Sequence, residues 1–484
     1  MGEHWVLLGV AFAAFLLNLF TNGQYGFHRD ELDILMNARR LDWGYVAYPP
    51  LTPFIARIGL ELFGPSLIGL RSFAALAQGI VVFLAGWMAR DMGGKRPAQI
   101  VAALAAFISP VGLIAGTLIQ YMSFDYLWWV LVAFFLVRLF KTDDPRWWLG
   151  IGAAIGLGMM TKFTILFWVA GLVAAVLLTS ARRYLRSPWL WGGVALALLV
   201  YMPNLIWQIQ HGFISLDFLS AIHARDIEWG RTDGFLVEQL YATTFLGTLP
   251  LWIAGLYLLI FSPTMKPFRP LGWMFLVTFA LLFFTRGRGY YLAPAYVMLL
   301  AVGSIWLEGR ISGALWVLAG GIVFGLLLIK PTAPINSLLW DVAIELSDNF
   351  VEMVGWPEMT EQVAAIYATI PEAEKPLTVI LVGNYGEAGA LELYGAPYDL
   401  PRVIGGGNSL WERGYGDFEP QTVIVVGFEL RQATKLFHYC EVAGVVTNAY
   451  DVKNEETTSH KLYYICRQPL RPWVEMWQDM RWFQ

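Results

Sequence analysis

Residues 188–208 read PWLWGGVALALLVYMPNLIWQ, a run of apolar and aromatic residues without Asp, Glu, Lys, Arg or His. A helix of about 20 such residues is long enough to cross the hydrocarbon core of a bilayer. Comparable runs recur through the first two thirds of the chain and predict a polytopic α-helical membrane protein with about eleven transmembrane helices. The predicted spans cover residues 5–21, 66–89, 97–115, 121–140, 146–160, 163–180, 188–208, 242–261, 270–285, 290–307 and 312–330.

The composition indicates the same class of protein. Of the 484 residues, 57% are hydrophobic and only 14% are charged, and the mean hydropathy is +0.53. Soluble globular proteins carry about 25% charged residues, so a single apolar core does not explain the deficit. The net charge of −4 offers no basic surface for a nucleic acid, and we expect no nucleic-acid partner.

The distribution of Lys and Arg sets the expected orientation. With the N-terminus in the cytoplasm, most basic residues fall in short connections on that side, as the positive-inside rule requires. An odd number of spans then places the C-terminal region on the outer face. The first apolar run follows Met1–His4 without a basic segment or a cleavage site, so we interpret it as a membrane helix and not as a signal peptide.

The outer segment 22–65 is long enough to have structure of its own. It predicts two short helices, near residues 29–42 and 50–63, separated by the helix-breaking sequence Tyr48-Pro49-Pro50. Apolar and polar residues alternate irregularly in both. We therefore expect these helices to lie along the membrane surface.

Residues 332–484 show the pattern of a soluble domain. Buried strands are predicted at 377–382, 421–426 and 461–466, and helices at 358–370, 386–394 and 430–438. We divide the chain into a membrane module, 1–331, and a small α/β domain, 332–484, on the outer face. The two cysteines, Cys440 and Cys466, both fall in this domain and could be disulfide-bonded or remain two buried free thiols.

Ionisable residues gather at the outer ends of the predicted spans, whereas the middles of the spans hold essentially none. Asp30 and Glu31 follow the first span, and Asp125 lies at the outer start of the fourth. Each carboxylate could simply stabilise a helix N-terminus. A carboxylate at this boundary can also act as a general base that takes a proton from an attacking hydroxyl. Asp125 needs a partner or a substrate, because an unpaired carboxylate at membrane depth is costly.

Cationic residues occupy the same side of the membrane. Lys162 lies in the turn between the fifth and sixth spans, and Arg286 and Arg288 precede Tyr291. In the simplest interpretation, the apolar stems of these side chains lie along the membrane and only their charged groups reach the interface with water. Phosphate binding is the functional alternative, since Arg gives bidentate contacts, Lys a point charge and Tyr a neutral donor. Basic residues on the outer side run against the positive-inside trend, which favours phosphate binding.

A carboxylate and a cluster of cations at the membrane surface suit sugar transfer from a lipid phosphate. The leaving group of that reaction is a phosphate, which needs charge stabilisation more than protonation. Glycosidases need a pair of carboxylates because their leaving group must be protonated. His223 and Arg225, in the second outer segment 209–241, could contact an acceptor or form part of a solvated loop.

Three blocks of sequence, in this order, carry a family resemblance. They run from Phe27-His28-Arg29-Asp30-Glu31 through Trp43-Gly44-Tyr45 to Pro49-Pro50-Leu51, then from Asp125 to the Gly156–Lys162 turn, and finally over Tyr290-Tyr291-Leu292-Ala293-Pro294. The sequence resembles the GT-C glycosyltransferases of the family 39 type. This group contains the protein O-mannosyltransferases and the bacterial aminoarabinose transferase of lipid A.

The resemblance implies roles for individual residues. Asp30 would be the catalytic carboxylate, Glu31 a supporting residue and Asp125 a second acidic residue of the site. Lys162, Arg286 or Arg288, and Tyr291 would face the donor phosphate. Related enzymes often carry polar, charged or His residues before the Pro-Pro pair, where this chain has Ala47 and Tyr48. We therefore carry over no metal ligand and expect no cofactor.

The resulting hypothesis is an inverting glycosyltransferase with hexosyl or pentosyl transfer as its reaction. It would use a polyprenyl-phosphate sugar and a glycolipid, polysaccharide or protein acceptor at the periplasmic face of a bacterial inner membrane. A lipid or polysaccharide transporter without glycosidic chemistry is the alternative. Transporters usually place ionisable residues near the bilayer centre, and the ion-free middles of the spans argue against that reading. A scaffold that acts through residues 332–484 is a third hypothesis.

Overall fold

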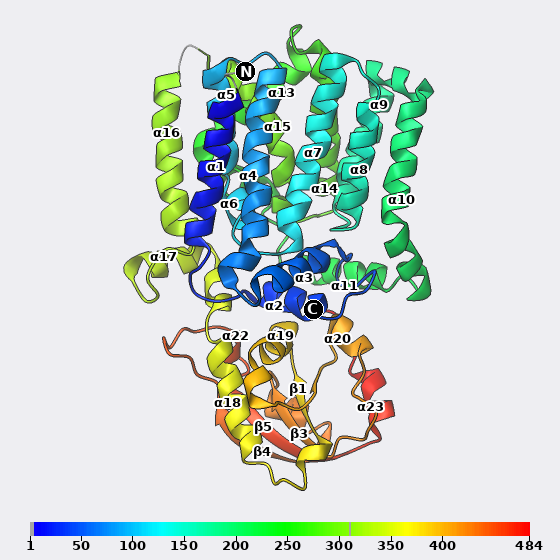
Figure 1. Cartoon of the computed structure of the whole chain (residues 1–484), viewed down its shortest axis with the longest axis vertical. Helices are drawn as coiled ribbons and strands as arrows, with labels where there is room; N and C mark the ends of the chain where they lie inside the picture. The colour runs from blue at the N-terminus through cyan, green and yellow to red at the C-terminus, as the bar shows by residue number, and fades with distance from the viewer. Residues whose placement is uncertain (1–3, 309–310) are drawn as a thin grey trace.

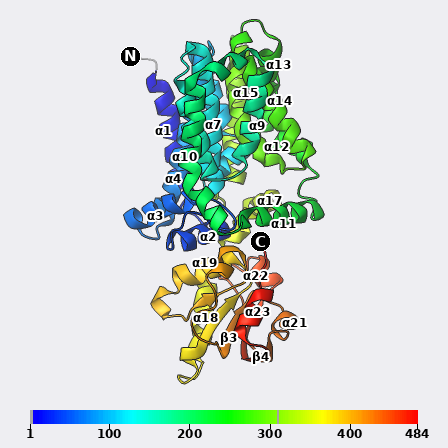
Figure 2. The same cartoon turned by 90° about the vertical axis from the view of Figure 1, so that its right-hand side faces the viewer.

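The computed structural model describes residues 4–308 and 311–484. A bundle of long helices lies above a small sheet domain, and several short helices lie between the two (Figure 1, Figure 2). The N-terminus is at the far end of the bundle, whereas the C-terminus lies near the junction with the sheet domain (Figure 1).

The bundle is built from apolar helices that pack through small residues, as membrane helices commonly do. Gly152 and Gly193 let two of them touch, since a Cβ on Gly152 would lie 2.1 Å from the Gly193 carbonyl oxygen. The bundle comprises α1 (His4–Thr21), α4 (Leu67–Asp91), α5 (Arg96–Phe107), α6 (Pro110–Ala115), α7 (Tyr121–Thr142), α8 (Trp147–Met159), α9 (Ile165–Leu178), α10 (Pro188–Gln210), α13 (Leu249–Phe261), α14 (Arg269–Phe284), α15 (Ala293–Trp306) and α16 (Ile311–Phe324).

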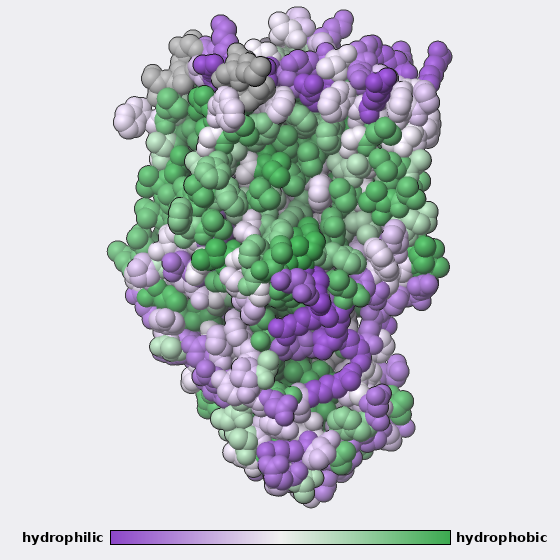
Figure 3. Space-filling model, viewed as in Figure 1, coloured by the Kyte–Doolittle hydropathy of each residue, from purple (hydrophilic) through white to green (hydrophobic). Residues whose placement is uncertain are grey.

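A hydrophobic band covers the face of the bundle that Figure 3 shows, with hydrophilic residues above and below it. Side chains such as Phe284 and Trp316, each 79% exposed, lie on the outside of the bundle. Water would not stabilise such a surface, whereas lipid tails do. The polytopic membrane class predicted from the sequence is confirmed.

The membrane spans are counted here from the length and composition of the helices. Within the described residues, five helices are long and apolar enough to cross a membrane, or up to seven if two bent pairs each form one span. The bends are 99° after Leu178 and 88° after Tyr241. Four shorter apolar helices join them in the bundle. The count of about eleven stays a prediction.

Short helices fill the junction between the bundle and the sheet domain. They are α2 (Arg29–Ala38), α3 (Leu51–Phe63), α11 (Ile214–Glu228) and α17 (Leu338–Leu346), whereas α12 (Phe235–Tyr241) lies beside α14 in the bundle (Figure 2). The two helices expected in 22–65 are therefore present as α2 and α3. However, α2 does not lie free on the membrane surface, because its residues 31–38 are all buried. It is held against α19 (Tyr385–Tyr394), where a Cβ on Gly389 would lie 2.5 Å from the Leu32 carbonyl oxygen.

The sheet domain, which we call the outer domain after its predicted orientation, contains one five-stranded sheet in the order β2-β1-β3-β5-β4. Strands β2, β1 and β3 are parallel, whereas β5 runs antiparallel to both β3 and β4. The strands are β1 (Thr378–Val382), β2 (Val403–Ile404), β3 (Thr422–Val426), β4 (Phe437–Val445) and β5 (Leu462–Pro469). The helices are α18 (Trp356–Ala368), α19, α20 (Asn408–Glu412), α21 (Leu430–Ala433), α22 (Glu455–Thr458) and α23 (Trp473–Asp479).

The sequence predicted β1, β3 and β5 and the helices α18 and α19, but the helix expected at 430–438 is wrong in its second half. The α21 helix ends at Ala433, and β4 begins at Phe437. This edge strand has mostly exposed side chains, so its sequence lacks the apolar alternation of a half-buried strand. Cys440 and Cys466, which pair across β4 and β5, form a disulfide. The domain boundary drawn after residue 331 stays a prediction.

Candidate functional site

The first outer loop presents Asp30 at the N-terminus of α2. His28 caps this helix, and its Nδ1 accepts a hydrogen bond of 3.1 Å from the Asp30 amide. The Asp30 carboxylate accepts a 2.8 Å hydrogen bond from the hydroxyl of Tyr385, the first residue of α19. Its side chain is 27% exposed, so one face stays open to a ligand. A residue of the outer domain therefore orients the predicted catalytic carboxylate.

Glu31 has a different environment from its neighbour. Its side chain is fully buried, and its two carboxylate oxygens accept bonds of 2.9 and 2.7 Å from the guanidinium of Arg71 in α4. The backbone amides of His28 and Ile119 donate to the same oxygens, each at 2.9 Å. The four acceptor positions of the carboxylate are thus occupied. In this structure Glu31 anchors α2 to the bundle and offers no free oxygen to a substrate.

A second carboxylate of α2, Asp33, belongs to a buried polar cluster. It accepts hydrogen bonds from the Tyr48 hydroxyl and, at 3.3 Å, from the Asn37 amide. Burial raises the pKa of Asp33 to about 6, although the Tyr48 bond opposes the shift. The Tyr48 ring packs against Tyr121, with centroids 5.5 Å apart. This contact connects the first outer loop to the start of α7.

Lys162 lies in a cage of three tyrosine rings. Its Nζ is 4.4 Å from the ring centre of Tyr291, 4.8 Å from Tyr121 and 5.7 Å from Tyr290. Such rings attract an ammonium through their negative faces. No carboxylate oxygen of the described residues lies within 4 Å of the Lys162 Nζ, although the charge of Asp125 acts on it from farther away. The tyrosines hold the ammonium in place and leave its charge available to an anion.

Asp125 lies close to this turn but points into the protein. Its oxygens accept hydrogen bonds of 2.8 Å from Thr164, two residues after Lys162, and 3.2 Å from the Trp129 indole. These donors supply the partners that a buried carboxylate requires. Asp125 therefore fixes the turn that carries Lys162, and its side chain is only 6% exposed.

The structure separates the two arginines that the sequence left undistinguished. Arg288 forms a bidentate pair with the buried Asp226, at 2.7 and 2.5 Å. Arg286 instead pairs with Asp233 at 2.8 Å, and both of those side chains are well exposed. The charges of Asp30 and Arg288 both act on the Tyr121 hydroxyl. Arg288 therefore belongs with the tyrosine cage, whereas Arg286 lies on the outer surface.

His223 and Arg225 lie on α11 rather than in an irregular loop. His223 is exposed. The Arg225 guanidinium lies 5.0 Å from the Trp229 ring centre, and its buried Nε makes no hydrogen bond within the described residues. Burial and the neighbouring Arg231 lower the pKa of Arg225. Acceptor contact by this pair stays a prediction.

The site thus joins Asp30, Tyr121, Lys162, Tyr291 and Arg288 at the junction of the bundle and the outer domain. Sequence reasoning missed four of its supporting residues, which are Arg71, Tyr121, Asp226 and Tyr385. The sequence could have indicated Arg71, since an arginine in the outer turn of a predicted span needs a partner. Within residues 4–308 and 311–484, no group of three or more His, Cys, Asp or Glu is placed to hold a metal ion. The sequence assigned no metal ligand and left metal dependence open, and that assignment stays a prediction.

Comparisons with known proteins bear on the fold of the chain. The family model for dolichyl-phosphate-mannose-protein mannosyltransferase matches residues 47–207. The crystal structure of ArnT from Cupriavidus metallidurans bound to undecaprenyl phosphate matches 96% of this chain and 98% of its own, with a TM-score of 0.58 at 18% identity. Its apo state gives a TM-score of 0.59 at 16% identity, over 95% and 97% of the two chains. This chain has the GT-C fold.

Curated proteins are similar in sequence to parts of this chain. An undecaprenyl phosphate-alpha-4-amino-4-deoxy-L-arabinose arabinosyl transferase of Pseudomonas fluorescens is 28% identical over 197 residues, 39% of this chain and 32% of that protein. The lipid A galacturonosyltransferase RgtD of Rhizobium johnstonii is 27% identical over 208 residues, 42% and 41% of the two chains. The matched segments span less than half the length of these two relatives.

Proposed function

We propose that the protein is an inverting glycosyltransferase that moves a hexosyl or pentosyl group from a polyprenyl-phosphate donor to a hydroxyl of its acceptor. The GT-C fold and the names of the two curated relatives support this class of reaction. The proposed acceptor is a glycolipid, polysaccharide or protein. The proposed location is the periplasmic face of a bacterial inner membrane, which the Cys440–Cys466 disulfide supports because disulfides persist in oxidising compartments.

The observation that most supports this proposal is the position of Lys162 among three tyrosine rings. Its ammonium has no carboxylate oxygen within 4 Å among the described residues, and it lies over the ring of Tyr121, whose hydroxyl also experiences the charge of Asp30. Hydroxyl attack requires a carboxylate that accepts a proton, and phosphate departure requires a fixed positive charge near the phosphate. The transporter alternative needs neither group in this arrangement.

In the proposed reaction, Asp30 takes the proton of the acceptor hydroxyl while the oxygen attacks the anomeric carbon. The bond from that carbon to the phosphate oxygen breaks, and the phosphate leaves with the electron pair. Lys162 and Arg288 stabilise the charge that develops on it. Tyr385 holds the Asp30 carboxylate in its orientation. Attack opposite to the leaving group inverts the configuration of the sugar.

Transfer by the purified full chain tests this proposal, with a panel of undecaprenyl-phosphate-linked sugars and extracted envelope glycans as acceptors. We expect Asp30→Asn to lower kcat by at least about 100-fold, since a general base contributes factors of this order. Asp217→Asn, which removes an exposed carboxylate of α11, is the matched control and should keep full activity. The assigned base is wrong if a folded Asp30→Asn protein turns over at the parental rate.

A Lys162→Gln variant tests the phosphate contact separately. We expect slower transfer from every donor of the panel, because each shares the phosphate. The exposed Lys453, paired with Asp451, gives the control variant Lys453→Gln. Transport without glycoside formation, observed when the same protein is placed in vesicles, would favour the alternative.

A further inference from the structure

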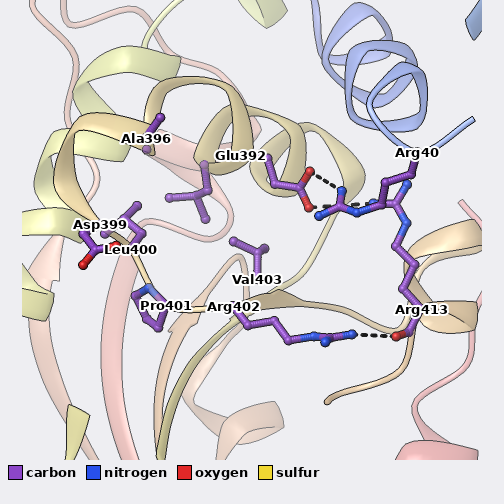
Figure 4. A pocket seen from close by; sticks show the side chains of 11 residues that line it. Arg40, Glu392, Ala396, Asp399, Leu400, Pro401, Arg402, Val403 and Arg413 are labelled. Carbon is purple, nitrogen blue, oxygen red and sulfur yellow. Dashed lines mark hydrogen bonds and ion pairs between the residues drawn. The ribbon is translucent and has the colours of Figure 1, made fainter. Parts of the chain in front are cut away.

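A cavity of about 620 Å³ opens at the junction of α2 with the outer domain (Figure 4). Arg40, just after α2, forms one wall, and the other walls come from α19, β2 and the end of α20. Three arginines line the cavity against two carboxylates. The cationic residues are Arg40, Arg402 and Arg413, and the acidic ones are Glu392 and Asp399.

The carboxylates leave much of this positive charge uncompensated. Glu392 pairs with Arg40 at 2.5 Å, whereas its other oxygen is 3.7 Å from Arg413 Nη1, beyond hydrogen-bonding distance. Arg402 donates to the carbonyl oxygens of Arg413 and Gly414, which are neutral acceptors. The residues that line the cavity therefore carry an excess of positive charge.

Arg413 is the arginine of the cavity whose hydrogen-bonding groups are least satisfied. Its side chain is only 18% exposed, and its buried Nη1 makes no hydrogen bond among the described residues. A buried guanidinium lacking an acceptor is costly. Burial and the nearby Arg40 lower the pKa of Arg413, although Glu392 opposes the shift. An anion bound in the cavity would compensate the charge of this side chain, which is partly exposed.

The same arginine connects the cavity to the site at α2. Its Nη2 donates a 2.6 Å hydrogen bond to the side-chain oxygen of Asn37, and the Asn37 amide donates to Asp33. Asp33 lies one helical turn after Asp30. A ligand in the cavity would thus be held beside the helix that carries the proposed base, on the outer-domain side and apart from the tyrosine cage.

We propose that this cavity binds an anionic group, a phosphate or a carboxylate, on the headgroup of the acceptor. Guanidinium groups match both anions in bidentate geometry. The volume admits a charged sugar unit rather than an isolated ion. This inference rests on the proposed transfer reaction, because it assigns the cavity to the acceptor.

Binding to the full chain in nanodiscs of neutral lipid tests the inference without donor or turnover. Calorimetric titration with glucose 1-phosphate should show saturable binding, and glucose at the same concentrations should show none. We expect Arg413→Gln to weaken binding by about tenfold, the value of one charge-assisted contact. Arg402→Gln at the rim gives a second variant that does not touch Asn37, and should weaken binding by at least about threefold. Arg471→Gln, which breaks an exposed pair with Asp479, should bind normally.

A competition arm separates the sources of the anion. A monophosphorylated glycolipid added to the nanodiscs should displace glucose 1-phosphate, and its dephosphorylated form should not. Displacement by inorganic phosphate alone, with no effect of the glycolipid, overturns the assignment to the acceptor. Equal binding by the wild-type, Arg413→Gln and Arg402→Gln proteins overturns the site itself. The Asp30→Asn protein should still bind, so failure of the transfer reaction remains distinguishable from failure of this site.

Discussion

The buried ion pair between Glu31 and Arg71 gives a sharp prediction, because both side chains are 0% exposed. Replacing Glu31 with Gln leaves the Arg71 charge buried beside a neutral amide. The amide offers one acceptor oxygen where the carboxylate offered two, so the amides of His28 and Ile119 compete with the guanidinium for it. Removal of one member of a buried pair costs about 3–5 kcal/mol. We expect that loss for Glu31→Gln.

Glu61→Gln is the matched control in the same outer segment. Glu61 is 64% exposed and pairs with Arg57 one turn away on α3, a contact worth at most about 1 kcal/mol. Unfolding of both variants in mixed detergent micelles measures the global difference. Hydrogen exchange of the α2 amides measures local opening, and a loss of 3 kcal/mol or more corresponds to exchange at least about 100-fold faster.

A double variant, Glu31→Leu with Arg71→Met, distinguishes a buried charge from lost packing. Removing both charges should cost less than removing Glu31 alone, since neither partner is then left unpaired. Because α2 carries Asp30, the single variant should also lose most transfer activity. Equal stability of Glu31→Gln and Glu61→Gln, with unchanged exchange in α2, would refute the anchoring role of this pair.

Three further outcomes follow from the outer domain. Tyr385→Phe removes the hydroxyl that orients Asp30, and we expect kcat to fall about three- to tenfold with little change in the donor KM, measured by steady-state transfer. Burial raises the pKa of Glu387 from 4.5 to about 8, so the folded state holds its proton more tightly than the unfolded state. Stability should therefore fall as pH rises from about 5 to 8. In thermal unfolding, the Glu387→Gln variant should show a weaker dependence of stability on pH. The expectation is contradicted if the stability of the variant changes with pH as steeply as that of the wild type. The Cys440–Cys466 disulfide closes a separation of 26 residues, and its reduction should destabilise the outer domain by about 2–4 kcal/mol. Unfolding with and without dithiothreitol tests this expectation. The double variant Cys440→Ser, Cys466→Ser is the control and should not respond to dithiothreitol.

The outer domain shows where sequence patterns were sufficient and where they were not. Strands β1, β3 and β5 were predicted because their central positions form short apolar runs bounded by turn residues. Strand β4 was missed because most of its side chains are exposed at the edge of the sheet, so its sequence lacks the alternation of a half-buried strand. The disulfide could not be chosen over two thiols until β4 and β5 were known to be neighbours, since cysteine spacing alone does not fix pairing.

The candidate site divides in the same way. Asp30, Lys162, Arg288 and Tyr291 were predicted as site residues, and the structure brings them to one junction. Glu31 was predicted with the catalytic group, yet its carboxylate is occupied by Arg71 and two amides. The choice between Arg286 and Arg288 required the positions of Asp226 and Asp233 on the second outer segment. Charge and residue type identified the candidates, and the surrounding partners decided what each can do.

The sequence by itself determined that this chain is a membrane protein whose candidate site residues lie at one boundary of the membrane, because hydropathy and charge are local properties. Only the tertiary structure decided which residues meet there. Arg71 reaches Glu31 across 40 residues, Tyr385 reaches Asp30 across 355, and Arg413 reaches Asn37 across 376. No local pattern encodes such contacts, since they arise from the packing of α2 between the bundle and the outer domain.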